Sequence, residues 1–144
     1  MHQSPPRSHR ASCHKSYGDL MQATILFAHG SSRASWREPF EAILTAIEST
    51  VADDHPVRLA FLELCPPTIE QAADELVGLG VTHIQILPLF MSGGGHVLRD
   101  LPPRLDQIRA RHPLIGVTIQ PALGEHPLVL EAIAHIVQGP TGTD

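Results

Sequence analysis

The 144-residue sequence predicts an α/β fold, with one domain built on a parallel sheet of four strands and helices on both faces. The length suits a single domain with its own core. Four short apolar runs, each typical of a buried strand, alternate with segments whose apolar residues recur at helical spacing. Such alternation predicts βαβ units with right-handed crossovers, and therefore a parallel sheet covered by helices.

The first apolar run, residues 24–28, predicts a strand buried on both faces of the sheet. It ends abruptly in residues 29–32, His-Gly-Ser-Ser, where Gly30 and the two serines break the strand. The helical spacing that follows predicts a helix carrying Trp36, Phe40, Ile43, Leu44 and Ile47. We therefore expect His29 where a buried strand stops, at the mouth of a loop.

The second apolar run, residues 57–62, predicts another strand and ends in Glu63. We expect Pro67 in the first turn of the next helix, where its missing N–H and fixed φ are tolerated. Apolar residues at helical spacing predict this helix over residues 69–77, and Gly78 and Gly80 are read as its stop signals.

The third strand is predicted over residues 82–89 and leads into three consecutive glycines, residues 93–95, followed by His96. Three glycines let the backbone take positive φ and approach a ligand closely. The next helix is predicted to begin near Leu98, to be interrupted or restarted at residues 102–103, Pro-Pro, and to end near residue 111.

The fourth strand is predicted over residues 115–120 and the last helix over residues 128–137. The apolar face of that helix would consist of Val129, Leu130, Ile133, Ala134 and Val137. Glu125 and His126 stand just before it, and they could either cap the helix or belong to a site.

The domain prediction is a folded unit over residues 23–138, between a disordered tail over residues 1–22 and a frayed C-terminus over residues 139–144. The tail is polar, rich in Pro and Ser, and lacks the apolar region of a secretory signal. Its three His are scattered without a fixed coordination geometry. Met21, just before the first strand, is a candidate natural start.

The formal net charge is −5, and the residues from Met21 onward carry fourteen acidic against seven basic side chains. This balance argues against nucleic acid or an anionic membrane as a main partner. No apolar run approaches the length that spans a membrane. The two cysteines, Cys13 and Cys65, are too few for a disulfide framework or a cysteine metal knuckle, so we expect a reduced, cytoplasmic protein.

In a parallel sheet the C-terminal ends of the strands share one edge, and ligands bind there. That edge would collect His29, Glu63 and His96, and also Glu125 and His126, which follow the fourth strand. Two imidazoles and a carboxylate are a suitable ligand set for a divalent first-row metal. Asp100, four residues after His96, could orient it as a hydrogen-bond acceptor or could simply cap the helix.

Several other patterns are read as structural or are excluded. The remaining histidines of the folded region, His55, His83, His112 and His135, are predicted to be solvated or structural. The glycine run lacks the spacing of a dinucleotide fingerprint and the Lys of a phosphate-binding loop. Ala28 stands where histidine phosphatases have an arginine, and no serine hydrolase elbow is present.

The motifs L-F-A-H-G-S-S-R, F-L-E-L-x-x-P-x-I and P-L-F-x-x-G-G-G-H-V-x-x-D resemble, in this order, those of the small class II chelatases of the CbiX and SirB type. The resemblance covers about residues 24–136. It implies a flavodoxin-type, chelatase-like fold and the insertion of a divalent metal into sirohydrochlorin or a related tetrapyrrole. The family's two metal-binding histidines fall on His29 and His96, and its acidic residue falls on Glu63.

The resemblance also implies Co²⁺, Fe²⁺ or Ni²⁺ as the metal substrate, no organic cofactor, and a homodimer that rebuilds the cleft of two-domain relatives. The tetrapyrrole carboxylates could pair with Arg33 and Arg99, which would otherwise face solvent. Further donors would be the backbone N–H groups of Ser31, Ser32, Gly93, Gly94 and Gly95.

Two other function classes stay open. The same residues could bind a metal or a tetrapyrrole for storage or delivery without turnover. Two histidines and a glutamate also resemble a catalytic zinc set, although no second general base for hydrolysis stands out. Metal insertion predicts acceleration over the spontaneous reaction, whereas a carrier predicts tight binding without acceleration.

Overall fold

The computed structural model describes residues 20–140, apart from the side chains of residues 96–98. Most of the predicted tail and of the predicted frayed C-terminus therefore lies outside the described residues. The elements, in chain order, are β1 (Gln22–Ala28), the 3-10 helix η1 (Ala34–Trp36), α1 (Glu38–Glu48), β2 (Val57–Phe61), α2 (Ile69–Gly78), β3 (His83–Pro88), α3 (His96–Arg111), β4 (Gly116–Ile119), the 3-10 helix η2 (Leu123–Glu125) and α4 (Pro127–Gln138).

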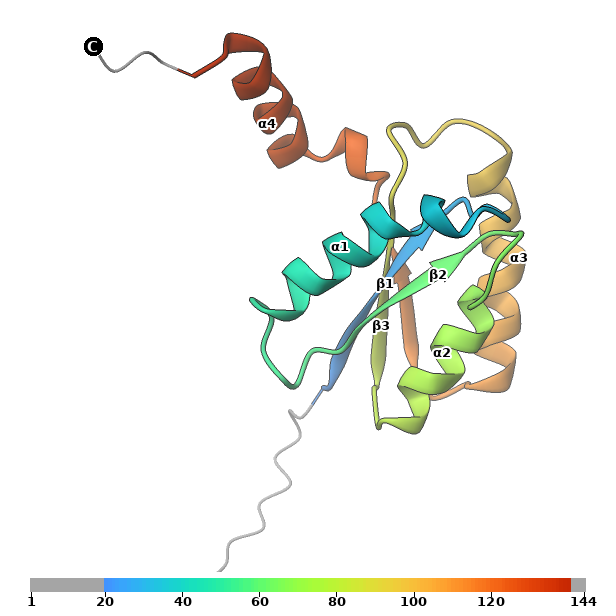
Figure 1. Ribbon diagram of the computed structural model, residues 1–144. Coiled ribbons are helices and arrows are strands. Elements are labelled where there is room, and N and C mark those ends of the chain that lie inside the picture. The colour runs from blue at the N-terminus through green and yellow to red at the C-terminus, as the bar shows by residue number, and fades with distance from the viewer. Residues whose placement is uncertain (1–19, 141–144) are drawn as a thin grey trace, which may run out of the picture.

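The four strands form one parallel sheet in the order β2-β1-β3-β4, as Figure 1 shows. This order matches the first four strands of the flavodoxin-type order. From β1 the chain passes to β2, which pairs with one edge of β1, and then to β3, which pairs with the other edge of β1. The carboxyl ends of β1 and β3 therefore flank the point where ligands bind in open α/β sheets.

Helices cover both faces of the sheet, as predicted. On one face Ile25, Phe27, Ile84 and Ile86 are fully buried beneath α2 and α3. On the other face Leu26, Ala28, Val57, Leu59 and Phe61 form a second cluster against α1. Because β1 contributes alternate side chains to both clusters, its sequence is a continuous apolar run rather than an alternating pattern.

The start of α2 is fixed by a capping box. The Thr68 side chain accepts the N–H of Gln71, and the Gln71 side chain accepts the N–H of Thr68. The expectation that Pro67 lies in the first helical turn is wrong, because Pro67 precedes the cap residue Thr68.

Helix α3 differs from its prediction. It begins at His96, with Gly95 as its N-cap residue, and runs without interruption through Pro102 and Pro103. Leu101 and Leu105, on either side of the prolines, are both buried in the core. Their packing holds the two halves of the helix together despite the missing N–H groups, each of which weakens a helix interior.

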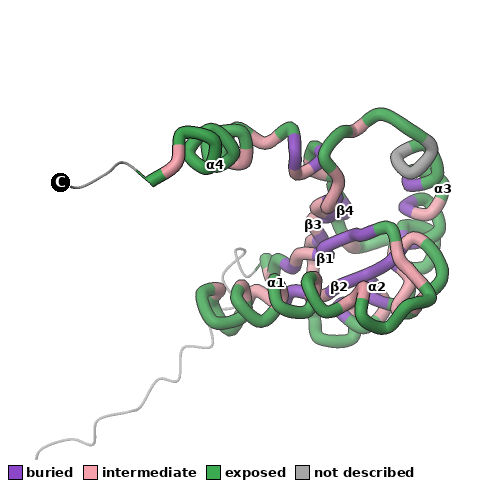
Figure 2. The backbone as a smooth tube through the Cα atoms, turned by 45° about the horizontal axis from the view of Figure 1, so that its top comes forward, coloured by how far each residue is buried: buried purple, intermediate pink, exposed green. Residues whose placement is uncertain are grey.

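Helix α4 extends away from the sheet in both views of the fold (Figures 1 and 2). Its sequence, PLVLEAIAHIVQ, contains eight Leu, Ile, Val or Ala residues among twelve, yet none of its residues is buried. Its large exposed apolar residues are Leu128, Leu130, Ile133, Ile136 and Val137. In the described part of the chain, no helix is both long and apolar enough to cross a membrane.

Candidate metal site at the sheet edge

The predicted pair of His29 and Glu63 lies together at the carboxyl edge of the sheet. His29 directly follows β1, and Glu63 follows the neighbouring strand β2 by two residues. The His29 Nδ1 atom is 3.7 Å from the Glu63 Oε1 atom, and the two side chains are 53% and 54% exposed. This separation is too long for a hydrogen bond. It is close to the ~3.4 Å between two ligands that each lie ~2.1 Å from a tetrahedral metal.

The main chain brings these two side chains to the same place. The β1–β2 pairing continues beyond the strands, because the Glu63 N–H donates to the His29 carbonyl over 3.2 Å. Gly30 then turns away with a φ of +98°, and a Cβ atom there would lie 1.8 Å from the Glu63 carbonyl oxygen. Glycine is therefore required at this position by both the backbone conformation and the close approach.

Arg37 supports the loop after β2, although it is not among the residues predicted for the site. Its guanidinium lies 5.0 Å from the centre of the Phe61 ring and donates over 3.0 Å to the Pro66 carbonyl. In the same loop Leu64 adopts a φ of +68°, a conformation that a branched side chain rarely takes. Strain of this kind often occurs at functional loops. The only sequence signal for Arg37 was its place next to the His-Gly-Ser-Ser loop.

His96, the third predicted metal ligand, is the first residue of α3. Its side chain lies outside the described residues, so the described side chains of the site are those of His29 and Glu63. The strand that precedes it in the chain, β3, is the neighbour of β1. Just beyond that pairing, the Leu89 N–H donates to the Phe27 carbonyl over 2.8 Å. Among the side chains that the structure describes, no group of three metal-ligating residues is assembled.

The two residues before α4 have different roles. The His126 side chain caps α4 by accepting the Leu128 N–H over 3.1 Å, which is the capping alternative. Glu125 instead accepts the N–H of Gly93 over 2.8 Å and so joins the glycine run. Asp100 lies inside α3, behind its N-cap Gly95, so the capping alternative for Asp100 is wrong.

The residues predicted to hold the tetrapyrrole lie on the same edge. Ser31 accepts the backbone N–H of Arg33 over 3.2 Å, and this turn leads into η1. The side chains of Ser32, Arg33 and Arg99 are exposed. A Cβ atom on Gly94 or on Gly95 would meet no atom within 4 Å, so the glycine run borders open space.

Three histidines outside this edge make hydrogen bonds within the fold. His55 pairs with Thr24 at 2.8 Å, His83 with Thr118 at 3.1 Å, and His112 with Asp74 at 2.6 Å. These contacts agree with the structural roles predicted for them. His135 is exposed on α4.

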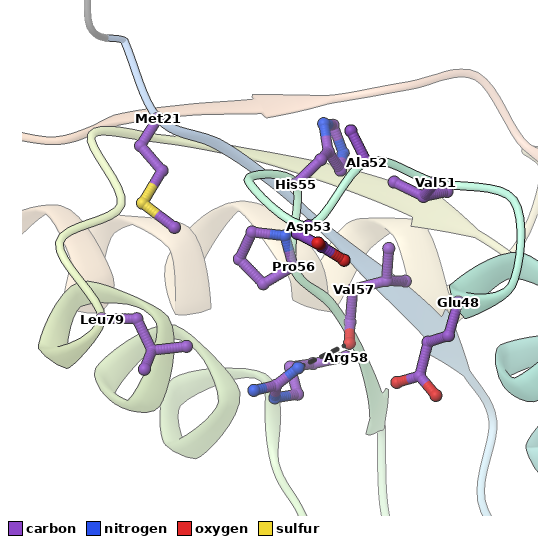
Figure 3. A pocket seen from close by; sticks show the side chains of 10 residues that line it. All are labelled: Met21, Glu48, Val51, Ala52, Asp53, His55, Pro56, Val57, Arg58 and Leu79. Carbon is purple, nitrogen blue, oxygen red and sulfur yellow. Dashed lines mark hydrogen bonds between the residues drawn. The ribbon is translucent and has the colours of Figure 1, made fainter.

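A hollow of about 430 Å³ lies at the opposite, amino-terminal edge of the sheet (Figure 3). Two of its polar side chains, those of Arg58 and His55, are engaged by the fold itself. Arg58 pairs with Glu75 at 2.7 Å and donates to the Val57 carbonyl, while His55 is bonded to Thr24. An imidazole and a carboxylate suited to a divalent metal lie 3.7 Å apart at the other edge, in His29 and Glu63.

Comparison with known proteins identifies the family. The CbiX family model matches residues 23–139. The sirohydrochlorin ferrochelatase of Bacillus subtilis is 28% identical over 117 residues, which are 81% of this chain and 44% of that protein. The sirohydrochlorin cobaltochelatase of Methanococcoides burtonii is 30% identical over 121 residues, covering 76% of this chain and 88% of that protein.

Among solved structures, the sirohydrochlorin chelatase SirB from Bacillus subtilis subspecies spizizenii, in complex with cobalt, superposes with a TM-score of 0.70 at 29% identity. The match covers 83% of this chain and 50% of SirB. The chain thus spans about half the length of the Bacillus relatives that it matches.

Proposed function

The chain belongs to the CbiX family, and from that premise we propose that it is a chelatase that inserts a divalent metal into sirohydrochlorin or a related tetrapyrrole. The observation that carries the proposal is the 3.7 Å separation of His29 Nδ1 and Glu63 Oε1 at the carboxyl edge of the sheet. The names of the relatives, which are sirohydrochlorin chelatases for iron or cobalt, supply the substrate class.

The metal substrate would be held by His29 and Glu63, with His96 as the third ligand. Neutral imidazoles and a carboxylate bind first-row divalent ions, and ligands of this kind can release them again more readily than thiolates. Co²⁺ is the metal that we propose first, with Fe²⁺ and Ni²⁺ as alternatives. Both described side chains are half exposed, so a metal and a flat macrocycle could approach them from solvent.

Metal insertion exchanges one M²⁺ ion for two pyrrole N–H protons, and it needs no covalent intermediate. As the macrocycle nitrogens replace the protein ligands on the metal, the Glu63 carboxylate would accept one proton and pass it to solvent. An imidazole exchanges protons near neutral pH, so His29 or His96 could take the second proton. The exposed Arg33 and Arg99 would pair with the carboxylates of the tetrapyrrole.

The test is a visible-absorbance assay of sirohydrochlorin with Co²⁺, Fe²⁺ and Ni²⁺, run without oxygen, with and without the protein. We expect acceleration that is lost in both His29→Ala and His96→Ala. The metal ion that is inserted fastest would be the preferred metal substrate. Metal binding without acceleration by any of the three ions would instead indicate a carrier, and it would overturn the enzymatic proposal.

A homodimer is part of this proposal. The chain corresponds to half of SirB, so a second copy would take the place of the second half of the longer relatives.

The exposed apolar surface of α4 supports this assignment. Glu131, His135 and Gln138 form one narrow polar strip, since residues three and four apart share a helix face. A helix that is apolar around the rest of its surface is normally buried.

On the side of α1, the part of the described sheet formed by β3 and β4 is partly polar. There Gln85 of β3 and Thr118 of β4 are paired in the sheet register and point away from the buried Ile86 side. We therefore assign the α4 surface to contact with a second copy. The cytoplasmic location, which the composition predicts, also remains part of this proposal.

A further inference from the structure

Two loops at the carboxyl edge of the sheet are joined to each other. One follows β3 and leads through residues 89–95 into α3, and the other follows β4 and contains η2. The Gly124 N–H donates to the Phe90 carbonyl over 2.9 Å. The Glu125 Oε1 atom accepts the Gly93 N–H over 2.8 Å, across 32 residues of sequence.

The first part of the loop after β3 is fixed by packing. The Phe90 ring lies edge-on to the buried ring of Phe27, with ring centres 6.0 Å apart. A Cβ atom on Gly124 would lie 2.1 Å from the Met91 carbonyl oxygen, so only glycine allows the two main chains to approach this closely. Up to Met91, therefore, the path of the loop is determined by the core and by η2.

The second part of the loop has no such packing. Gly93, Gly94 and Gly95 have no side chains to anchor them, and at Gly94 and Gly95 even an added Cβ atom would meet nothing within 4 Å. Three glycines also have more conformational freedom than any other residues. Within the described residues, the side-chain hydrogen bond to this run comes from Glu125.

We propose that Glu125 is a positioning residue, whose carboxylate holds the glycine run and thereby fixes the start of α3 at His96. The inference rests on the proposed function, because it assigns a role for the loop that carries the second histidine ligand. A carboxylate that accepts a backbone N–H forms a stronger hydrogen bond than a neutral acceptor does. Residues that orient metal ligands typically change metal affinity or activity 10–100-fold when they are replaced.

The experiment compares Glu125→Ala with Glu125→Gln, and uses Glu131→Ala on the exposed face of α4 as the matched control. Co²⁺ affinity is measured by competition with a coloured chelator, and chelatase kinetics are measured as above. We expect Glu125→Ala to weaken Co²⁺ binding about 10–100-fold. Glu125→Gln should remain close to wild type, because an amide oxygen can accept the same N–H.

The glutamine variant distinguishes positioning from direct chemistry. A metal ligand or a general base at this position would need the charge, so Glu125→Gln would then be as defective as Glu125→Ala and would have an altered pH profile. That result would overturn the proposal. A positioning residue leaves the pH profile of Glu125→Gln unchanged.

A third measurement needs no activity. Amide hydrogen exchange over residues 91–95 should be faster in Glu125→Ala than in wild type, and unchanged in Glu131→Ala. If the variants show these exchange rates but the wild-type protein inserts no metal, the chelatase assignment fails while the loop contact stands. Wild-type exchange and wild-type Co²⁺ affinity in Glu125→Ala would overturn the positioning role itself.

Discussion

Gly30 packs so closely against the main chain of Glu63 that a Cβ atom on Gly30 would lie 1.8 Å from the Glu63 carbonyl oxygen. The contact joins the two segments that carry the side chains of the candidate metal site, since Gly30 follows His29. We predict that Gly30→Ala pushes the loop after β2 away from β1 and separates the His29 and Glu63 side chains. The positive φ adds to the strain, for a total loss of about 1–3 kcal/mol of stability. Co²⁺ binding should fall together with the free energy of unfolding.

The matched control is Gly78→Ala, at the end of α2. A Cβ atom there would meet nothing within 4 Å. Alanine is the better helix former by about 0.5–1 kcal/mol, so this variant should be neutral or slightly stabilised and should bind Co²⁺ normally. Wild-type Co²⁺ affinity in Gly30→Ala would contradict the packing argument.

A second prediction concerns His29 and Glu63, the two proposed metal ligands whose side chains the structure describes. We expect His29→Ala and Glu63→Ala each to weaken Co²⁺ binding by at least about 100-fold, since direct ligands should matter more than the groups behind them. If the two side chains hold one ion, the double variant should be little worse than either single variant, because each change already disrupts the shared site. Calorimetric titration with Co²⁺ measures all three affinities.

Glu48→Ala, at the opposite edge of the sheet, serves as the control for charge alone. It removes one carboxylate from the same protein but should leave Co²⁺ binding unchanged. Losses that simply add in the double variant would indicate that His29 and Glu63 act at separate places.

The fold and the meeting of His29 with Glu63 could be predicted from the sequence because both follow from alternation. Apolar runs separated by helical periods give parallel strands, and parallel strands end at one edge. The contacts of Gly30 with Glu63 and of Glu125 with Gly93 could not be predicted this way. They depend on the paths of loops that are far apart in the sequence, and no local pattern encodes those paths.

The two errors about α3 and Pro67 have a similar origin. Proline rules describe an isolated helix, in which Pro102 and Pro103 would end or restart it. In the protein, the buried Leu101 and Leu105 hold the helix on both sides of the prolines. At α2 the capping box of Thr68 and Gln71 sets the first residue, so local hydrogen bonding determines the boundary instead of Pro67.

A third prediction concerns stability away from the site. The Asp74 carboxylate on α2 bonds to Arg111 and, over 2.6 Å, to His112, and so ties α2 to the end of α3. Asp74→Ala leaves two donors without their acceptor, and we expect a loss of about 1–3 kcal/mol in urea unfolding. For comparison, Glu75→Ala breaks the exposed pair with Arg58 and should cost less than about 1 kcal/mol. Equal losses in the two variants would argue against a special role for Asp74.

The last prediction tests α4 as the contact between two copies. Ile133 lies in the middle of the exposed apolar surface of α4, whereas His135 lies on its polar strip. We expect the wild-type protein to be a dimer by light scattering coupled to size exclusion. Ile133→Glu should make it monomeric, because a charge buried between two apolar helices has no partner. His135→Ala should remain dimeric. If each copy holds the metal with its own His29 and Glu63, as proposed, monomeric Ile133→Glu should still bind Co²⁺, and it should insert the metal more slowly if a second copy completes the cleft for the macrocycle. A monomeric wild type, or a dimer that survives Ile133→Glu, would show that α4 does not form the contact.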